Sequence, residues 1–266
     1  MLERTLWTAC ITPFNNNLGI DYESLSYCLK LQANAKNGLV LLGSTGEALS
    51  LARHECESIL KHACSLNLST EIVVGVPSYN MSIATEWIKF CEDLPIQGYL
   101  IATPMYTKPG LLGQTAWFEK LLNTITRPAI LYNIPGRTGV QLIPEVVGNL
   151  CNHKNFVAIK DSGGCVKNFM EYKTIAKNIA IYCGDDHMMP AMSAMGASGL
   201  ISVASNALPM VVQKNTQNCI NGNKININTW WSICNALSTA RNPIPIKLLM
   251  KKIGIIKNRN VRPPLN

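Results

Sequence analysis

Apolar runs of strand length alternate with helix-length amphipathic segments along most of this 266-residue chain. The expected strands cover residues 8–12, 38–42, 71–76, 98–102, 129–132, 156–160, 179–183 and 199–203. Nearly continuous apolar strands separated by helices are typical of a parallel sheet that is covered on both faces. Eight such units, spaced by roughly 20–30 residues, fit an α/β fold of the (β/α)8 TIM-barrel class.

Helical periodicity predicts helices over residues 22–33, 48–66, 81–91, 112–125, 143–150, 166–177 and 187–195. Asp21 and Ser78 are the expected N-caps of two of these helices, and Pro144 suits a first helical turn. A doubly wound open sheet is the alternative fold. It would more naturally stop at about five to seven strands, and no G-x-G-x-x-G motif follows the first strand here.

Strand signals stop after Asn206. Residues 208–221 have the pattern of an eighth barrel helix, and residues 227–240 and 245–253 have the pattern of appended helices, joined by a polar segment at 221–224. We therefore expect a (β/α)8 catalytic barrel over residues 1–222 and a C-terminal helical segment over residues 223–266.

Composition bounds the class of protein. The chain is 47% hydrophobic and 15% charged, which indicates a globular protein. No apolar run approaches the roughly 18 residues of a membrane span, and residues 1–7 lack the features of a signal peptide, so we expect a cytoplasmic location. The ten cysteines include no C-x-x-C pair and no zinc-ligand spacing, which favours structural thiols at apolar positions.

The net charge of +8 raises the question of nucleic-acid binding. Lysine and arginine occur singly along most of the chain, and the one dense basic tract covers residues 247–262. No RNP, zinc-finger or helix-turn-helix signature accompanies this tract. We therefore expect a solvated basic surface that helps to attract anionic substrates.

A lysine ends the sixth expected strand. The apolar run at residues 156–159 leads directly into Lys160, and Gly163 and Gly164 then turn the chain. An ammonium group at the mouth of an apolar pocket loses hydration, which favours the neutral amine, and a neutral lysine forms Schiff bases with carbonyl substrates. The alternative is a lysine that extends from a strand end into solvent, which is the more common case.

Polar residues also follow other strands, and in a barrel the carboxyl ends of the strands meet at one face. They are Ser44 and Thr45 after the second strand, Tyr106 after the fourth, Tyr132 and Arg137 after the fifth, and Gly184, Asp185 and Asp186 after the seventh. The turn at residues 43–47 opens a helix and suits a small carboxylate, although an ordinary capped turn has the same pattern. Arginine offers two donors to a carboxylate, and tyrosine transfers protons.

Three motifs occur in a specific order: G-S-T-G-E at residues 43–47, Y-N-x-P-x-R-T-G at 132–139 and A-I-K-D-S at 158–162. With these motifs the chain resembles the dihydrodipicolinate synthase family of the class I pyruvate-dependent aldolases, from residues 7–9 to residues 242–247. The resemblance implies a lyase that condenses pyruvate with L-aspartate 4-semialdehyde through a lysine Schiff base. The product would be 4-hydroxy-tetrahydrodipicolinate, in the diaminopimelate and lysine biosynthesis pathway.

The resemblance also implies roles for individual residues on the pyruvate side. Lys160 matches the Schiff-base lysine, and Thr45 matches the residue that binds the pyruvate carboxylate. Ser44, Tyr132 and Tyr106 match a hydroxyl relay for protons, in which Tyr106 comes from the adjacent subunit. Ser44 replaces the threonine of the family and keeps the hydroxyl group that the relay needs.

On the side of the second substrate, Arg137 matches the residue that receives the carboxylate of aspartate semialdehyde. Gly184 and Ile201 match positions that line the site through their backbones. No metal or organic cofactor is implied, because the lysine itself is the electrophilic catalyst. The family implies a homo-oligomer, at least a dimer and commonly a tetramer as a dimer of dimers, although the segment 206–242, which often shapes the tetramer contact, is shorter here than the family norm.

Three other functions are alternatives. Another aldolase of the superfamily, such as N-acetylneuraminate lyase or a 2-keto-3-deoxy-sugar-acid aldolase, would share Lys160 and Tyr132 but would usually lack Arg137. A catalytically inactive barrel used as a binding module would fit the loss of these residues, and all three are present. A nucleic-acid binder would require a binding module that the sequence does not contain.

Many bacterial members of the family are inhibited by lysine at a cleft between two subunits. At the corresponding positions this chain has Ala48, Leu49, Ala84 and Met105, and it retains Asn80. An ammonium ligand placed among apolar side chains is desolvated without an anionic partner. We therefore expect feedback inhibition by lysine to be weak or absent.

Overall fold

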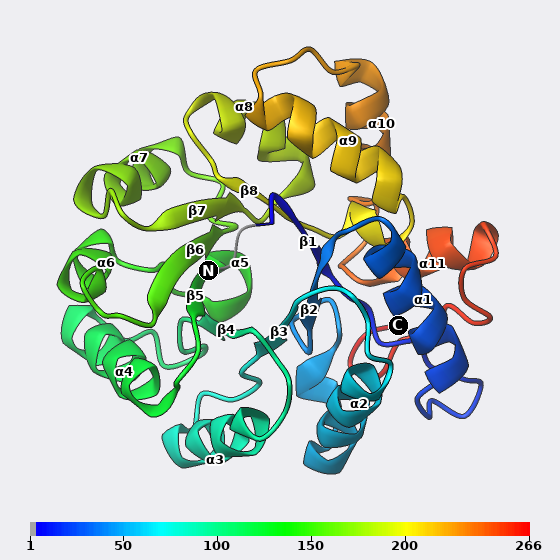
Figure 1. Cartoon of the computed structure of the whole chain (residues 1–266), viewed down its shortest axis with the longest axis horizontal. Coiled ribbons are helices and arrows are strands. Elements are labelled where there is room, and N and C mark those ends of the chain that lie inside the picture. Colours follow the sequence, from blue (N-terminus) through cyan, green and yellow to red (C-terminus); the bar gives the residue numbers. More distant parts are fainter. Residues whose placement is uncertain (1–3) are drawn as a thin grey trace.

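The computed structural model describes residues 4–266, and within this range the chain forms a closed barrel of eight parallel strands. The strands are β1 (Leu6–Ala9), β2 (Gly38–Leu41), β3 (Ile72–Gly75), β4 (Gly98–Ala102), β5 (Ala129–Asn133), β6 (Phe156–Asp161), β7 (Ala180–Cys183) and β8 (Gly199–Ser202). Each strand pairs with the next along the chain, and β8 closes the barrel against β1. The TIM-barrel prediction is confirmed, as the view down the barrel shows (Figure 1).

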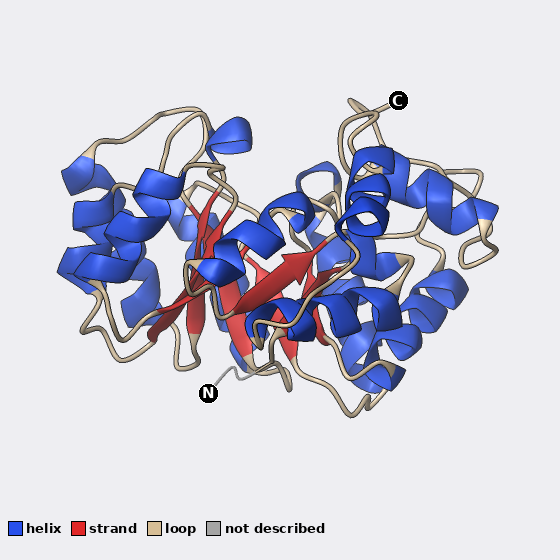
Figure 2. Cartoon of the chain, turned by 90° about the horizontal axis from the view of Figure 1, so that it is seen from above, coloured by secondary structure: helices blue, strands red, loops and turns tan. Residues whose placement is uncertain are grey.

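Helices surround the strands on all sides (Figures 1 and 2). The α-helices are α1 (Tyr22–Asn34), α2 (Arg53–Ser65), α3 (Met81–Glu92), α4 (Leu111–Thr124), α5 (Pro135–Thr138), α6 (Pro144–Leu150), α7 (Val166–Ile175), α8 (Met189–Ala194), α9 (Pro209–Ile220), α10 (Ile227–Ala236) and α11 (Ile244–Lys252). Three 3-10 helices are η1 (Ala48–Ser50), η2 (Asp186–Met188) and η3 (Ala204–Asn206). None of the helices in the described part of the chain has the length and apolar character needed to cross a membrane. The expected division of the chain into a barrel over residues 1–222 and a C-terminal helical segment over residues 223–266 remains a proposal.

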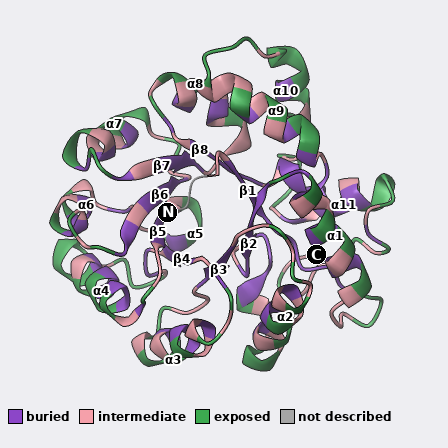
Figure 3. Cartoon of the chain, viewed as in Figure 1, coloured by how far each residue is buried: buried purple, intermediate pink, exposed green. Residues whose placement is uncertain are grey.

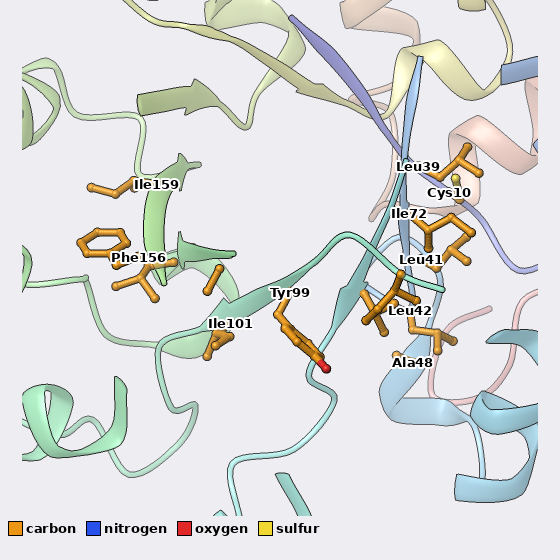
Figure 4. Close-up of a cluster of buried hydrophobic side chains, with 14 of the residues drawn as sticks. Cys10, Leu39, Leu41, Leu42, Ala48, Ile72, Tyr99, Ile101, Phe156 and Ile159 are labelled. Carbon is orange, nitrogen blue, oxygen red and sulfur yellow. The ribbon is translucent and has the colours of Figure 1, made fainter. Parts of the chain in front are cut away.

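Strand side chains alternate between two hydrophobic cores. The lumen of the barrel is filled by Trp7, Ala9, Val40, Val73, Leu100, Ile130, Tyr132, Ala158, Tyr182 and Ile201. Neighbours such as Leu39, Leu41 and Ile159 belong to a second core between the strands and the helices (Figure 4). Buried residues accordingly cover the strands and the inner helix faces, while exposed residues lie on the outer faces (Figure 3). Since both strand faces are buried, the strands appear in the sequence as continuous apolar runs.

Trp7 fills the lumen at the amino ends of the strands. It is completely buried and is the register partner of Gly38, the first residue of β2. A Cβ atom at Gly38 would lie 2.2 Å from the indole ring of Trp7, so this position requires glycine. The amino end of the lumen is therefore closed by packing, and chemistry is left to the carboxyl ends of the strands.

Two local predictions are wrong. The N-cap of α3 is Asn80 rather than Ser78, because Asn80 Oδ1 accepts the backbone N–H groups of Ser82 and Ile83 at 3.1 and 3.2 Å. The helix expected over residues 48–66 is interrupted, since the two residues between η1 and α2 have an extended backbone. Apolar residues continue across this break, so periodicity does not reveal it.

Several element ends differ from the prediction by a few residues. β1 covers Leu6–Ala9 rather than residues 8–12, and α10 ends at Ala236 rather than at residue 240. The segment 187–195 is divided between η2 and α8. Asp21 caps α1 through its side chain and Pro144 begins α6, as predicted.

The basic tract at residues 247–262 is not the fully solvated surface expected from the sequence. Lys247 is completely buried and forms an ion pair with Glu47. Arg262 binds both carboxylate oxygens of Glu55, each at 2.6 Å. These contacts use two of the positive charges to fix the C-terminal segment to the barrel.

All ten cysteines are free, and six of them are buried. Burial raises the pKa of Cys56 to about 11 and that of Cys28 to about 12. A thiol that stays protonated at neutral pH is a poor nucleophile and a poor metal ligand. The expected structural role of these cysteines fits this environment.

Candidate active site

Lys160 lies near the carboxyl end of β6, with its side chain in the lumen. It follows the lumen residue Ala158 by two positions, so the two side chains share one face of the strand. Its register partners are Tyr132 on β5 and Tyr182 on β7. Lys160 is only 4% exposed, and its Nζ lies 4.2 Å from the centroid of the Tyr132 ring. The fold therefore brings together two of the predicted site residues.

Gly184, which directly follows β7, leaves the space that Lys160 needs. A Cβ atom at this position would lie 3.1 Å from Lys160 Cε and 2.0 Å from Ser162 Oγ. The N–H of Gly184 donates to the carbonyl of Asp161 at 2.7 Å, which holds the backbone against β6. Any side chain here would displace Lys160 or Ser162.

A buried polar pair supports the strand ends behind Lys160 and Tyr132. Asn133 Nδ2 donates to Asp161 Oδ1 at 2.7 Å, and the N–H of Gly163 donates to the same oxygen at 3.0 Å. Asn133 Oδ1 in turn accepts the N–H of Leu142 at 2.9 Å. Burial raises the pKa of Asp161, while the hydrogen bonds from Asn133 and Gly163 lower it. Sequence reasoning did not single out this pair, although its members directly follow the tyrosine and the lysine.

Thr45 lies in the turn at residues 43–47 and is 3% exposed. Its Oγ1 accepts a hydrogen bond of 2.9 Å from Asn242 Nδ2, and the N–H of Glu47 donates to Ser44 O at 3.2 Å to close the turn. Ser44 itself is half-buried. The turn leads into the three-residue η1 rather than the long helix expected.

A buried ion pair holds this turn from behind. Glu47 has a left-handed backbone with φ 55°, and its side chain pairs with Lys247, where both side chains are at most 1% exposed. Lys247 Nζ also donates to Asn260 O at 2.9 Å, and the N–H of Arg262 donates to Glu47 at 2.9 Å. Burial lowers the pKa of Lys247, and the carboxylate of Glu47 opposes that effect. Removing either partner of this buried pair would leave an uncompensated buried charge.

Asn242 joins the two residues predicted to bind carboxylates. Its backbone carbonyl accepts a hydrogen bond of 2.8 Å from a guanidinium nitrogen of Arg137, and its side-chain amide donates to Thr45. Arg137 is exposed on the short helix α5. Asn242 was noted in the sequence only as the start of a matching stretch, and the contact with Thr45 spans 197 positions.

The predicted hydroxyl relay is not connected within one chain. Tyr106 follows β4, is 85% exposed, and donates its backbone N–H to Thr138 O at 3.2 Å. Across residues 4–266, no hydrogen bond links the hydroxyl groups of Ser44, Tyr106 and Tyr132. Of these three residues, Tyr132 contacts Lys160 through its ring, and Tyr106 lies in solvent.

β8 is fixed at its carboxyl end by Asp186. The Asp186 carboxylate accepts hydrogen bonds from Ser202 Oγ and from the N–H groups of Val203 and Ala204, the last two at 3.0 and 3.2 Å. Ile201 precedes this clamp and is completely buried in the lumen.

A cavity of about 210 Å³ opens beside these strand ends, and its lining includes Gly184, Asp185, Asp186, His187, Val203 and Asn242. Two of the lining residues contact predicted site residues, because Gly184 lies against Lys160 and Asn242 binds Arg137, but Lys160 and Arg137 do not line the cavity themselves. The part of the chain that the structure describes contains no group of three or more His, Cys, Asp or Glu residues able to hold a metal ion.

Comparison with known proteins agrees with the family resemblance expected from the sequence. The model of the Dihydrodipicolinate synthetase family matches residues 3–266. A 4-hydroxy-tetrahydrodipicolinate synthase of Wolbachia pipientis subsp. Culex pipiens is 50% identical over 262 residues, which cover 98% of this chain and 89% of the relative. The protein of the same name from Chlamydia caviae is 46% identical over 261 residues, which cover 98% of this chain and 90% of the relative.

A solved structure shares the fold closely. It is a chloride-inhibited dihydrodipicolinate synthase from Acinetobacter baumannii complexed with pyruvate, which matches with a TM-score of 0.93 at 29% identity. The match covers 99% of this chain and 93% of that chain. Sequence and fold therefore select the same group of proteins.

Proposed function

The chain belongs to the dihydrodipicolinate synthetase family, and on that premise we propose that it condenses pyruvate with L-aspartate 4-semialdehyde through a Schiff base at Lys160. It is a lyase with 4-hydroxy-tetrahydrodipicolinate synthase activity in lysine and diaminopimelate biosynthesis. The observation that supports Lys160 most strongly is its buried position in the lumen, against the Tyr132 ring and in the space that Gly184 leaves.

In the first half of the reaction, Lys160 Nζ attacks the ketone carbon of pyruvate, and water leaves to give an iminium ion. The iminium withdraws electrons from the neighbouring methyl group, which loses a proton to form an enamine. We assign this proton movement to Tyr132 because its ring contacts Lys160, with Ser44 and Tyr106 as the rest of the relay. Thr45 is assigned to the pyruvate carboxylate because it is buried in a turn with nearby backbone N–H groups.

In the second half, the enamine carbon attacks the aldehyde carbon of L-aspartate 4-semialdehyde and forms the new C–C bond. The amine of the adduct then attacks the iminium carbon, which closes the ring and releases Lys160 as a free amine. Arg137 is assigned to the substrate carboxylate, because one of its nitrogens binds Asn242 O and the exposed guanidinium retains further donors. Gly184 and Ile201 are assigned to the lining of the site.

The proposed chemistry needs no metal or organic cofactor, because the iminium ion serves as the electron sink.

We also propose a cytoplasmic location. Ten free cysteines are in keeping with a reducing compartment.

We propose that the active form is a homo-oligomer, at least a dimer and further a tetramer built as a dimer of dimers. Tyr106 is 85% exposed and Leu112 is 84% exposed in a single chain. Contact with a second chain would remove these two large side chains from water. A neighbouring subunit would then supply Tyr106 to complete the relay with Ser44 and Tyr132.

The proposal is tested with a panel of aldehydes offered to the enzyme at saturating pyruvate. We expect turnover with L-aspartate 4-semialdehyde and none with N-acetylmannosamine or glyceraldehyde. Arg137→Ala should raise the Michaelis constant for the semialdehyde about tenfold to a few hundredfold, while formation of the pyruvate adduct stays unchanged. Turnover with a sugar aldehyde would indicate a different aldolase, and the absence of any pyruvate adduct would indicate a binding module.

A further inference from the structure

The turn at residues 43–47 lies between two residues with a left-handed backbone. Leu42, directly before the turn, has φ 56°, and Glu47, its last residue, has φ 55°. Residues other than glycine rarely adopt this conformation, and it persists only where the surrounding structure holds it. The turn that carries Ser44 and Thr45 therefore depends on contacts from outside its own sequence.

The contacts that hold Thr45 and Glu47 through their side chains come from the C-terminal segment. Asn242 Nδ2 donates to Thr45 Oγ1 at 2.9 Å. One carboxylate oxygen of Glu47 pairs with the Lys247 ammonium group, and the other accepts the N–H of Arg262 at 2.9 Å. Both oxygens of Glu47 are thus bound by residues that follow it by 200 and 215 positions.

Lys247 is itself fixed in place. It lies on α11, is completely buried, and places its Nζ 4.2 Å from the centroid of the Phe14 ring. The same Nζ donates to Asn260 O at 2.9 Å. Glu47 therefore meets its ammonium partner at one defined point of the structure.

Stability alone does not account for such a pair. Apolar residues of similar volume in the place of a buried ion pair often leave a protein equally stable or more stable. Hydrogen bonds differ from apolar contacts in that they require a particular distance and direction. The pair thus supplies geometry at Glu47, which lies two residues after Thr45.

We propose that Glu47, held by Lys247, is a positioning residue that sets the turn at residues 43–47 for the carboxylate of pyruvate. This inference rests on the proposed function, and in it Glu47 acts through Thr45 and the neighbouring backbone N–H groups. A shift of Glu47 would move these groups relative to Lys160. A displacement of about 1 Å in a binding group can lower a rate about a hundredfold.

The test compares two ketones that differ in the carboxylate. Acetone has the ketone and the methyl group of pyruvate, with a second methyl group in place of the carboxylate. Lys160 can form an iminium ion with either ketone, but only pyruvate uses the turn. The rate at which each ketone labels Lys160 is followed by mass spectrometry after borohydride reduction.

The variant Glu47→Gln with Lys247→Met removes both charges together, so neither is left buried alone. Its rate of labelling by pyruvate should fall about tenfold to a hundredfold. Labelling by acetone should change by less than about threefold, because acetone has no carboxylate for the turn to bind.

Glu55→Gln is the matched control. Glu55 also binds the C-terminal segment, through the guanidinium of Arg262, but it lies on α2 rather than in the turn. Its loss should change labelling by either ketone less than about threefold, even though it weakens the attachment of the same segment.

A second measurement uses the unaltered enzyme. Coupling between two sites is reciprocal, so bound pyruvate should strengthen the contacts of Glu47. The N–H of Arg262, which donates to Glu47, should exchange with deuterium several-fold more slowly in the borohydride-reduced pyruvate adduct than in the free enzyme. The N–H of Thr126, which donates to the carboxylate of Glu92, is the control and should exchange at an unchanged rate.

Equal losses with both ketones in the double variant, or unchanged labelling by pyruvate, would overturn the inference and leave the proposed function intact. If the double variant fails to fold cooperatively, the exchange measurement decides, and equal changes at Arg262 and Thr126 would overturn the inference. A wild-type enzyme that pyruvate does not label at Lys160 would overturn the proposed function, and the inference with it.

Discussion

Lys160 Nζ lies 4.2 Å from the centroid of the Tyr132 ring, and the two residues are register partners on β6 and β5. The contact is made with the face of the ring rather than with the hydroxyl group. The ring therefore contributes packing and shields the amine from solvent, while the hydroxyl group is available for proton transfer. These two contributions can be separated by a single substitution.

Tyr132→Phe keeps the ring and removes the hydroxyl group. We expect kcat to fall by about a hundredfold or more, as for the loss of a proton-transfer group, with a melting temperature close to that of the wild type. Steady-state kinetics and thermal unfolding measure the two quantities. A variant with wild-type kcat would remove Tyr132 from the relay.

Gly184→Ala inserts a Cβ atom 3.1 Å from Lys160 Cε and 2.0 Å from Ser162 Oγ. We expect a loss of about 1–3 kcal/mol in the free energy of unfolding, which is typical of an overpacked core, together with slower formation of the pyruvate adduct. Gly110→Ala is the control, because a Cβ atom there meets nothing within 4 Å. Equal effects of the two substitutions would contradict the close approach at Gly184.

Glu55 links stability to pH. The hydrogen bonds from Arg262 hold the pKa of Glu55 below its ordinary value of 4.5. Because the folded-state pKa is lowered, the contribution of Glu55 is complete above pH 4.5 and is lost as the pH falls through the lowered value. We expect Glu55→Gln to reduce the free energy of unfolding by about 1–3 kcal/mol at neutral pH, with a difference from wild type that shrinks in acid.

Denaturant unfolding between neutral pH and about pH 3 measures this difference. Glu57→Gln is the matched control, since the Arg53–Glu57 pair lies one helical turn apart on the surface and should contribute about 0.5 kcal/mol or less. A penalty for Glu55→Gln that is constant across the whole pH range would contradict the account.

Lysine should be a weak inhibitor or none. A cavity of about 170 Å³ near η1 is lined mostly by apolar side chains, with Ser78 and with Arg53, whose guanidinium lies 5.0 Å from the centroid of the Trp87 ring. Ala84 on α3 is completely buried and offers no acidic group. An ammonium ligand would meet a cation here instead of a carboxylate. In an activity titration with L-lysine, half-inhibition at or below about 1 mM, or roughly −4 kcal/mol of binding, would contradict this expectation.

The barrel could be predicted from the sequence because the signals for its strands are local. Every strand is buried on both faces, and this burial produces the apolar runs that mark the eight units. The ends of elements were less predictable where two neighbouring residues could each act as the N-cap of a helix. Ser78 and Asn80 are both good caps, and the choice of Asn80 depends on the path of the preceding loop.

The site was predictable to the extent that its residues follow strands. Lys160, Tyr132 and Gly184 meet because the carboxyl ends of β5, β6 and β7 are neighbours. Contacts made by the C-terminal segment leave no local signal, since Asn242 and Thr45 are 197 positions apart and Lys247 and Glu47 are 200 apart. Lys247 therefore had the sequence pattern of a solvated charge, although it is buried in an ion pair.

The central claim is that Lys160 forms the Schiff base, and its most direct test is peptide mapping by mass spectrometry after borohydride reduction in the presence of pyruvate. We expect one pyruvate-derived label per chain, on Lys160. Lys160→Ala should carry no label, and Lys160→Arg should also carry none because a guanidinium stays protonated at any working pH. A label on another lysine, or undiminished labelling and turnover in Lys160→Ala, would contradict the account.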